Sequence, residues 1–389
     1  MKIALFDYFV DGSNAIGAFH RMLVRGLAPA QRFHVFACRY ADAQSSLADF
    51  VPVPVLCSRP LVLLAALYRL LARLVFWWRR LIKGERFDLV QGVEGNIGFA
   101  DLAYAHFCHR FFLQSEWPNI RHGQSTARSL FRLWDHKLRA VFEPSAYRRA
   151  RWIAVPSQGL KRELEATYPA ARGKITVLPN PVNISFMTPD PNYQRDPWRL
   201  QHGIPQSATT LAFIALGHFE RKGLPLLMEA LQSEPSLNLM LMIVGGRADL
   251  VGAYRDRAGA MGLAEKLVFF GMQTDVRPFL WAADGFILPS FYEVFPTVAL
   301  ESAAAGLPVL STPLNGVEEF LVDGENGLLM ERSVQGVAEG LRRFAAMSAA
   351  KRHEMGARAR ASVAQYSEEN FLKNWRALYA RIEQELQAG

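Results

Sequence analysis

The sequence predicts an α/β protein with two doubly wound domains, each a parallel sheet covered by helices on both faces. Three observations lead to this prediction. The 389 residues are too many for one ordinary core and suit two domains of typical size. Half of the residues are hydrophobic and 21% are charged, the composition of a folded globular chain. Short apolar runs also alternate with amphipathic stretches along most of the length.

The strand-like runs form two successive series, one for each predicted sheet. Those of the first sheet are Ile3–Phe6, Phe33–Ala37, Val53–Leu56, Leu89–Val90, Trp152–Val155 and Ile175–Leu178. Those of the second are Leu211–Leu216, Leu239–Val244, Leu267–Phe270, Gly285–Leu288 and Pro308–Leu310. Helical segments such as Leu224–Gln232 and Val334–Phe344 fall between them, so we expect parallel strands joined by crossover helices.

The domain boundaries follow from two further segments. Residues 183–210 are rich in Pro, Asp, Asn and Gln without clear periodicity, which predicts a linker. The tail Glu368–Gln387 has Phe371, Trp375, Leu378 and Ile382 at helical spacing, which predicts an amphipathic helix. We therefore place the first domain at 1–185, completed by a helix at 367–389, and the second at 186–366.

The charge is uneven along the chain. Residues 1–185 hold 25 Lys and Arg against 13 Asp and Glu, whereas 186–389 hold 19 against 23. A basic first half favours an anionic partner, although a solvated basic surface has the same composition.

The cysteines and the N-terminus point to a reducing cytosol. The chain has an odd number of cysteines, Cys38, Cys57 and Cys108, which are widely spaced and form no CxxC motif. This argues against structural zinc and against a disulfide framework. The first residues lack the apolar stretch and cleavage site of a signal peptide.

Residues Leu61–Lys83 form the longest apolar segment. Arg69, Arg73, Arg79 and Arg80 interrupt it, and each costs about 2.5–3.5 kcal/mol at a bilayer centre, which argues against a spanning helix. Leu, Phe and Trp beside Arg and Lys are typical of a helix lying in an anionic membrane interface. The alternative is a helix that packs on the sheet and exposes a few arginines.

The stretch from 283 to 330 carries the strongest chemical signal. The strand Phe286–Leu288 leads into a loop at its carboxyl end, the place where open parallel sheets bind ligands. Pro296 suits the first turn of the next helix, whose free N–H groups at Thr297 and Val298 would bind a phosphate. Glu293 lies before this helix and Glu301 about a turn into it, and carboxylates there accept hydrogen bonds from sugar hydroxyls. Two glutamates eight residues apart also occur by chance on solvated helices.

A second signal lies at 213–223, where a strand, a polar loop and a glycine open a helix. Arg221 and Lys222 are adjacent there and would neutralise a diphosphate, one as a planar fork and the other as a point charge. An ordinary surface Arg-Lys pair has the same sequence.

The first domain offers weaker candidates. His106 and His109 follow a strand-like run, and a neutral imidazole there would donate or accept a proton near a reacting hydroxyl. Gly17 opens a predicted helix after the first strand, where its backbone would approach a diphosphate, and Gly12 is a weaker candidate in the same loop. The loop is not GxGxxG, which argues against a nicotinamide site.

The stretch DVRPFLWAADGFILPSFYEVFPTVALESAAAGLPVL resembles the glutamate-pair signature of the retaining glycosyltransferases of family 4, and the Arg-Lys segment most resembles the lipopolysaccharide-core transferases. The resemblance implies a GT-B fold: two Rossmann-like domains facing a central cleft, with a C-terminal helix crossing back to the first. It implies that Glu293 contacts the donor sugar, that Glu301 binds the ribose, and that Arg221 and Lys222 bind the diphosphate.

The resemblance departs from the common pattern at several positions. His218 stands where the arginine usually follows the first glycine, Pro181 replaces a glycine in the turn 178–183, and the paired glycines near Gly17 are missing. The family places a histidine facing donor sugar and acceptor, for which His106 fits best and His109 second.

The function expected from these observations is transfer of a sugar from a nucleotide-sugar donor, UDP- or GDP-linked, to a saccharide or lipid-linked acceptor in cell-surface glycan synthesis. No Asp-x-Asp motif is present, so no metal and no other cofactor is expected. We expect a location at the cytoplasmic membrane face, with Leu61–Lys83 on anionic lipid, and no nucleic-acid partner. The alternatives are a phosphorylase or epimerase of the same fold, or a non-catalytic membrane-associated binding module.

Overall fold

A computed structural model describes residues 1–43, 45–57, 61–120 and 126–388. The chain divides into two compact units, passing from the first to the second between Asn180 and Pro181 and returning between Glu368 and Glu369. Each unit contains one parallel sheet with helices, so the predicted α/β class is confirmed.

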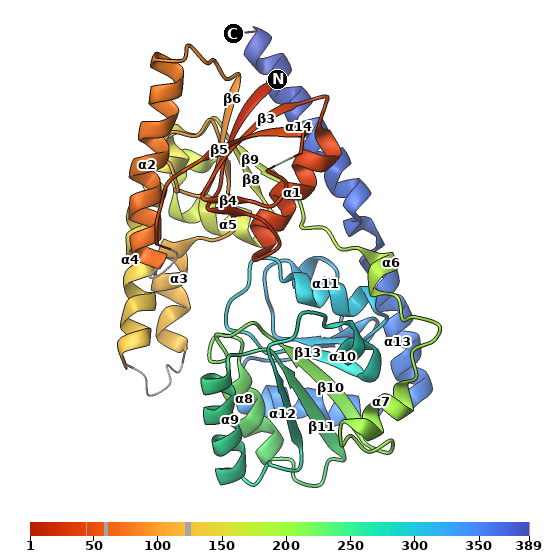
Figure 1. The fold of residues 1–389 in the computed structure, drawn as a ribbon. Coiled ribbons are helices and arrows are strands. Elements are labelled where there is room, and N and C mark those ends of the chain that lie inside the picture. The colour runs from red at the N-terminus through yellow and green to blue at the C-terminus, as the bar shows by residue number, and fades with distance from the viewer. Residues whose placement is uncertain (44, 58–60, 121–125, 389) are drawn as a thin grey trace. The chain divides into compact units, whose positions relative to one another are not determined.

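The first unit is built on a seven-stranded parallel sheet of order β5-β3-β1-β6-β7-β8-β9 (Figure 1). Its strands are β1 (Lys2–Phe6), β3 (Arg32–Ala37), β5 (Ala48–Pro52), β6 (Leu89–Val93), β7 (Leu102–Tyr104), β8 (Trp152–Val155) and β9 (Ile175–Val177). Its helices are α1 (Ala15–Leu27), α2 (Leu61–Leu81), α3 (His109–Ser115), α4 (Thr126–Arg149), α5 (Gln158–Thr167) and α14 (Glu368–Ala388). A short parallel pair, β2 (Phe9–Val10) and β4 (Arg39–Tyr40), lies outside the main sheet.

The two faces of this sheet have separate cores, because successive strand residues point to opposite faces. Ile3 and Leu5 of β1 join one core together with α1 and α14. Ala4 and Phe6 join the other, which includes Tyr68 and other residues of α2. The parallel strands are therefore buried on both sides, as the continuous apolar runs require.

The C-terminal helix packs on the first unit, as expected. Its residues Phe371, Trp375, Leu378 and Ile382 are all buried in the core that contains α1. Gly26 of α1 allows a close approach, since a Cβ there would lie 2.5 Å from the Leu372 side chain. The chain thus returns to complete the unit in which it began.

The second unit contains a six-stranded parallel sheet of order β12-β11-β10-β13-β14-β15. Its strands are β10 (Thr209–Ile214), β11 (Leu239–Val244), β12 (Leu267–Gly271), β13 (Gly285–Leu288), β14 (Val309–Ser311) and β15 (Gly327–Leu329). Its helices are α6 (Ile184–Met187), α7 (Arg195–Gln201), α8 (Leu224–Gln232), α9 (Ala248–Ala260), α10 (Arg277–Ala282), α11 (Thr297–Ala304), α12 (Val334–Ala345) and α13 (Ala349–Ser362). Alternate residues of β10 again enter different cores, Leu211 and Phe213 one and Ala212 and Ile214 the other.

Two local predictions were wrong. The strand expected at Val53–Leu56 lies earlier, at β5, because this edge strand has mixed exposure and therefore no apolar run of its own. The segment expected to be a plain linker contains α6 and α7, which are too short to show a helical period. Arg199 of α7 is buried and pairs with Asp284 at 2.8 Å, which fixes the segment to the second unit.

Candidate active site

The predicted donor residues lie at the carboxyl edge of the second sheet. The loops that leave β10, β13 and β14 emerge there side by side, because these three strands are neighbours in the parallel sheet. The loop after β10 carries Arg221 and Lys222, and the loop after β13 carries Glu293. Residues about 70 positions apart in the sequence are thereby brought together.

Arg221, Lys222 and Glu293 form one charged cluster. The Lys222 Nζ lies 2.7 Å from the Glu293 Oε1, and an Arg221 guanidinium nitrogen lies 3.5 Å from the same oxygen. Arg221 also donates to the Tyr292 carbonyl at 2.7 Å, and its own carbonyl accepts from the Phe291 N–H at 2.8 Å. The two loops therefore hold each other in place through both backbone and side chains.

The electrostatics of this cluster favour an anionic ligand. Burial lowers the pKa of Lys222, and the nearby Glu293 charge offsets this only in part. Burial by itself would raise the pKa of Glu293, but the charges of Lys222 and Arg221 lower it below its usual value. One carboxylate thus faces two cations in a poorly solvated place, which leaves an excess of positive charge for a diphosphate.

A glycine makes this loop packing possible. Gly223 follows Lys222 with φ of +80° and directly precedes α8. A Cβ at this position would lie 1.9 Å from the Pro289 carbonyl oxygen, which belongs to the facing loop. Only glycine allows both this conformation and this approach.

The helix after β13 offers backbone donors and a second carboxylate. α11 begins at Thr297, and helix geometry leaves the N–H groups of Thr297 and Val298 without intrahelical acceptors. Glu301 lies in its second turn, and burial raises its pKa. Within the described part of the chain, the Glu301 carboxylate has no ion-pair or hydrogen-bond partner. A partly exposed carboxylate in this condition is suited to accept hydrogen bonds from ligand hydroxyl groups.

A cavity of about 320 Å³ lies beside this cluster in the second unit. Its lining includes Glu220 and Phe291, the neighbours of Arg221 and Tyr292 in the two facing loops, and Arg332, whose guanidinium lies over the Phe291 ring at 5.9 Å.

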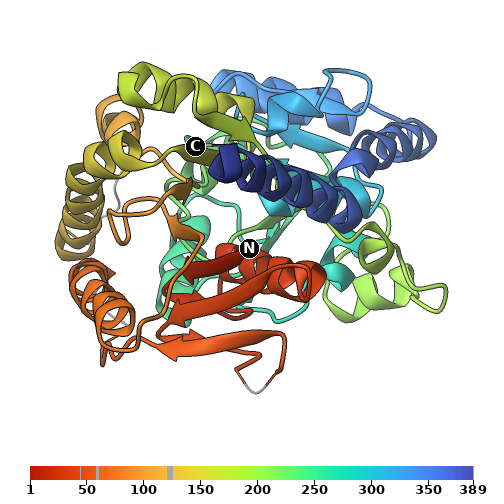
Figure 2. The ribbon, with the colours of Figure 1, turned by 90° about the horizontal axis from the view of Figure 1, so that it is seen from above.

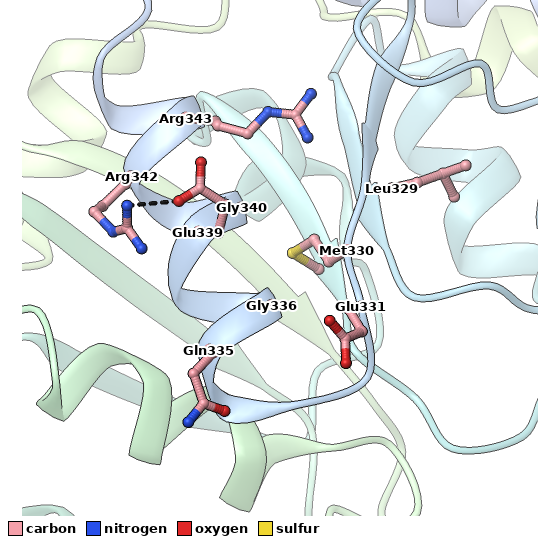
Figure 3. Close-up of a pocket in the computed structure, with 9 residues that line it drawn as sticks. All are labelled: Leu329, Met330, Glu331, Gln335, Gly336, Glu339, Gly340, Arg342 and Arg343. Carbon is pink, nitrogen blue, oxygen red and sulfur yellow. Dashed lines mark ion pairs between the residues drawn. The ribbon is translucent and has the colours of Figure 1, made fainter.

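Another groove, of about 380 Å³, lies between α12 and the edge strand β15 (Figure 3). Gly336 and Gly340 let Glu331 and Met330 pack closely on α12, since a Cβ on either glycine would lie 2.5 Å from one of these residues. The charged residues of the groove include the ion pair of Glu339 with Arg342. It contains none of the residues predicted from the sequence, and we assign no function to it.

In the first unit, His106 follows β7 at the carboxyl edge of the sheet. Its ring lies between Phe19, at 6.2 Å, and Tyr104, at 4.1 Å between ring centres. Burial lowers the pKa of His106 to about 3, despite the opposing charge of Glu94, so the imidazole is neutral at physiological pH. Its Nε2 is buried and has no hydrogen-bond partner among the residues that the structure describes.

His109 is placed differently, inside a polar network at the start of α3. Its Nε2 lies 3.4 Å from a Glu94 carboxylate oxygen, and its Nδ1 lies 2.9 Å from the Nδ1 of His136. Its backbone N–H donates to Glu143 at 2.6 Å. Of the two candidate histidines, His109 thus has polar partners at both ring nitrogens, whereas the His106 Nε2 has none among the described residues.

Glu94 is a residue that the sequence analysis missed. It directly follows β6, has a φ of +49°, and lies within 3.7 Å of Arg139. Burial alone would raise the pKa of Glu94, but hydrogen bonding to His109 and the charges of His109 and Arg139 lower it. Strained backbone at a non-glycine residue costs on the order of 1–3 kcal/mol and is found mostly at functional sites. The feature of the sequence that could have revealed Glu94 is its place directly after a buried strand.

A buried chain of hydrogen bonds joins α14 to the end of β1. The Tyr379 hydroxyl donates to Gln91 Oε1 at 2.6 Å, Gln91 Nε2 lies 3.3 Å from His20 Nε2, and His20 Nδ1 lies 2.9 Å from Asp7. If Gln91 donates to His20, then His20 must donate from Nδ1 to Asp7. The sequence analysis did not predict this chain of hydrogen bonds, because Tyr379, Gln91 and Asp7 are far apart in the sequence.

The loop glycines have structural roles in this geometry. The Gly17 N–H donates to the Asn14 side chain at 2.8 Å, which caps α1, and a Cβ on Gly17 would lie 2.0 Å from the Phe9 carbonyl oxygen. Gly12 has open space around it. Their contact with a ligand stays a prediction.

No group of three or more His, Cys, Asp or Glu side chains arranged to hold a metal occurs among the residues that the structure describes. Metal-independent chemistry also remains a prediction.

Two parallel doubly wound units, with the returning C-terminal helix and a cation–carboxylate cluster on the second sheet, define the GT-B class of nucleotide-sugar-binding proteins. Two family models match this chain: "Glycosyltransferase Family 4" over residues 18–186 and "Glycosyl transferases group 1" over residues 209–346. The chain belongs to glycosyltransferase family 4, and the resemblance predicted from the glutamate pair is confirmed.

Among curated proteins, the chain is 40% identical over 131 residues to the lipopolysaccharide core biosynthesis glycosyltransferase LpsE of Rhizobium meliloti strain 1021. That alignment covers 33% of this chain and 37% of the relative. The chain therefore spans well under two thirds of the relative's length, and the activity of that relative is evidence for a proposal only.

Solved structures match over the whole length and support the fold. WaaG, a glycosyltransferase involved in lipopolysaccharide biosynthesis, aligns with a TM-score of 0.72 at 20% identity, covering 96% of this chain and 98% of that one. Alr3699/HepE of Anabaena, solved in complex with UDP-glucose, aligns with a TM-score of 0.70 at 18% identity, covering 100% of both. The predicted GT-B fold is thus confirmed.

Proposed function

We propose that this protein is a retaining glycosyltransferase that takes a sugar from a nucleotide-sugar donor. The observation that supports it most directly is the cluster of Arg221, Lys222 and Glu293 beside the N-terminus of α11. As the nucleoside diphosphate departs, two cations and free backbone N–H groups stabilise its developing charge. Electrostatic stabilisation of this kind usually contributes more to the rate enhancement than any other single effect.

Each predicted residue has a defined part in this proposal. Arg221, Lys222 and the N–H groups at the start of α11 bind the diphosphate, Glu293 contacts the donor sugar, and Glu301 accepts from the ribose. His106 is neutral and unpartnered, so it is able to accept a hydrogen bond from a sugar hydroxyl or donate one to it. Retention of anomeric configuration follows from family membership and is checked by the anomeric proton coupling of the product.

We propose the donor and the acceptor from the chemistry of the site and from the names of similar proteins. Because HepE was solved with UDP-glucose, a UDP-sugar is the first donor to test. Because LpsE and WaaG are named for lipopolysaccharide synthesis, the proposed acceptor is a lipid-linked saccharide of a cell-surface glycan.

The features of α2 support a proposal for the location of the enzyme. By length and composition this helix is able to cross a membrane, with 21 residues and a mean hydropathy of 1.7. However, one of its faces is packed on the sheet, and the Tyr68 hydroxyl donates to the Phe36 carbonyl at 2.6 Å, which disfavours a spanning helix. The other face exposes Trp77 and Trp78, with Arg80 over the first ring at 5.4 Å and Lys83 over the second at 4.9 Å. We therefore propose that α2 lies against anionic lipid, which supports the expected peripheral location on the cytoplasmic face of the membrane.

The donor site is tested by thermal shift with UDP, GDP, ADP and dTDP at equal concentration. Selective stabilisation by one nucleotide is expected for the wild type, and its loss is expected in Arg221→Ala/Lys222→Ala and in Glu301→Ala. Arg342→Ala/Arg343→Ala is the matched control, because it removes two adjacent arginines of the same unit at the groove of Figure 3. Equal shifts in all variants, or no shift with any nucleotide, would contradict the proposed donor site.

A further inference from the structure

The inference concerns a small polar cavity at the carboxyl edge of the first sheet. The loops after β1, β6 and β7 emerge there side by side, because these strands are neighbours in the parallel sheet. The cavity has a volume of about 10 Å³, which is close to the space that one water molecule or one hydroxyl group needs. Its floor is buried and includes Glu94, Asn96 and His109, and its rim is half-buried and includes Tyr8, Arg139 and Phe142.

The walls of this polar cavity are fixed by packing between elements. α3 and α4 lie side by side in both views of the molecule (Figures 1 and 2). Gly95 lets α4 approach the loop after β6, since a Cβ on this glycine would lie 2.9 Å from the Phe142 side chain. Arg69 of α2 donates to the Gly95 carbonyl and lies over the Phe142 ring at 4.4 Å. The cavity is therefore a defined feature of the folded unit.

Many polar groups around the cavity have partners within the protein. Glu143 accepts from the His109 N–H at 2.6 Å and from the Arg110 N–H at 3.1 Å. The Arg139 Nε donates to both carboxylate oxygens of Asp135 at 3.2 Å. These bonds stabilise the start of α3 and the middle of α4, and they leave the floor of the cavity as the place to look for unused capacity.

Two oxygen atoms of the floor lack donors. The Asn96 Nδ2 donates to the Phe6 carbonyl at 3.1 Å, which fixes the amide, but the buried Asn96 Oδ1 has no hydrogen-bond partner in the described part of the chain. The contacts of Glu94 with His109 and Arg139, at 3.4 and 3.7 Å, both end on its Oε2. Its Oε1 accepts no hydrogen bond from the residues that the structure describes. A buried oxygen without a donor is unfavourable, and a ligand that donates to it would remove that penalty.

The charges around the cavity favour a neutral donor group. Burial by itself would raise the pKa of Glu94, but hydrogen bonding to His109 and the charge of Arg139 lower it, so this carboxylate is ionised at neutral pH. Arg139 faces both this carboxylate and that of Asp135. A phosphate or carboxylate ligand would therefore meet an excess of negative charge, the reverse of the donor cluster, in which two cations face one carboxylate. A hydroxyl donates a hydrogen bond without adding charge, and it fits a space for one small group.

We propose that Glu94 and Asn96 form a subsite that recognises one hydroxyl group of a neutral saccharide. The backbone strain of Glu94, with its φ of +49°, is then retained because it positions the carboxylate at this cavity. His106 follows the neighbouring strand β7 and lies close enough to Glu94 for the carboxylate charge to act on its imidazole. The inference rests on the proposed sugar transfer only in naming this saccharide as the acceptor, and the two residues then determine which acceptors bind.

The test measures the affinity of the full chain for neutral sugars by saturation-transfer NMR, without nucleotide. The probes are the methyl α-glycosides of glucose, galactose and mannose, together with the derivatives of each that lack a single hydroxyl group. For at least one glycoside, removal of one hydroxyl is expected to weaken binding to the wild type by roughly tenfold or more, as one hydrogen bond to a charged acceptor is lost. The same removal is expected to have a much smaller effect in Asn96→Ala and in Glu94→Gln, because each variant has lost part of what that hydroxyl contacts.

Asp101→Asn is the matched control in the same unit. Asp101 directly precedes β7, at the opposite edge of the sheet, and its carboxylate accepts from the Val90 N–H at 2.9 Å. This variant should keep the wild-type difference between a glycoside and its deoxy derivative. Melting temperatures show whether each variant is folded, and Glu94→Gln provides the test if Asn96→Ala is not.

Three results would overturn the inference. The wild-type difference in folded Asn96→Ala and Glu94→Gln would mean that the cavity holds a structural water only. Competition by inorganic phosphate would contradict the argument from charge, and the absence of binding by every glycoside would contradict the subsite itself. The outcome is separate from that of the donor site, because the glycoside measurement contains no nucleotide and the nucleotide thermal shift contains no acceptor.

Discussion

Replacing Glu293 by Gln tests the reasoning about the donor site most directly. In the wild type, the carboxylate lies 2.7 Å from Lys222 and 3.5 Å from Arg221, and all three side chains are largely buried. The substitution keeps the size of the side chain but leaves two close cations without their anion. Breaking a buried pair in this way costs about 3–5 kcal/mol, and we expect about 2–3 here because the amide oxygen still accepts a hydrogen bond.

This loss is measurable as a melting temperature. For a unit of this size, about 2–3 kcal/mol corresponds to a fall of about 5–10 °C. A nucleoside diphosphate supplies the missing negative charge, so its stabilising shift should be larger in Glu293→Gln than in the wild type. In the variant, a UDP-sugar should raise the melting temperature no more than UDP does, because the proposed sugar-binding carboxylate is gone. The rate of sugar transfer should also fall.

The pH dependence has a defined sign. Since the pKa of Glu293 is lowered in the folded protein, its stabilising contribution is present above the unfolded pKa and is lost as pH falls through the folded pKa. Glu293→Gln should lack this acid-dependent loss.

Glu301→Gln is the matched control for that substitution. Burial raises the pKa of Glu301, so its charge opposes folding above that pKa, and the variant should melt no lower than the wild type at neutral pH while binding nucleotide more weakly. The reasoning is refuted if Glu293→Gln melts like the wild type, or if nucleotide stabilises it less.

Three further substitutions test separate parts of the structure. Gly223→Ala should lower the free energy of unfolding by more than about 1 kcal/mol, because φ is +80° and the Pro289 carbonyl blocks the Cβ. It should also abolish the rise in melting temperature that nucleotide causes. An unchanged rise, measured by calorimetry, would contradict this. Glu94→Gln should lower the free energy of unfolding, measured in urea, by about 2 kcal/mol, because His109 loses its carboxylate partner. The rise in melting temperature that nucleotide causes should be unchanged in this variant. Loss of that rise would show that Glu94 couples the first unit to the donor site. Trp375→Ala should cost about 3–5 kcal/mol, because this fully buried ring joins α14 to the first core, and native-like stability would mean that α14 is dispensable.

The fold class and the donor-site residues were readable from the sequence because their signals are local. Continuous apolar runs predict strands buried on both faces, and the loop after such a strand is the place for Arg221 or Glu293. The spacing of Phe371, Trp375 and Leu378 likewise predicts a buried helix face without any knowledge of what it covers.

The short elements were not readable. Strands β7 and β15 have three residues each, and α6 has four, so each covers little more than one period of its pattern and shows no repetition that would reveal it. The edge strand β5 was misplaced because a strand with partly exposed faces has no apolar run.

The resemblance ranked His106 above His109, but only the tertiary structure revealed the surroundings that differ between these two histidines, which follow the same strand. Only it revealed the strained backbone of Glu94 and the chain of hydrogen bonds from Tyr379 to Asp7, in which the bonded pair Tyr379 and Gln91 is 288 residues apart in the sequence. The apolar residues Leu130, Trp134 and Val141 of α4 have a helical spacing in the sequence, but a period shows only that one face is apolar. Whether that face meets a core or remains uncovered depends on non-local packing, which the three-dimensional arrangement of the chain decides.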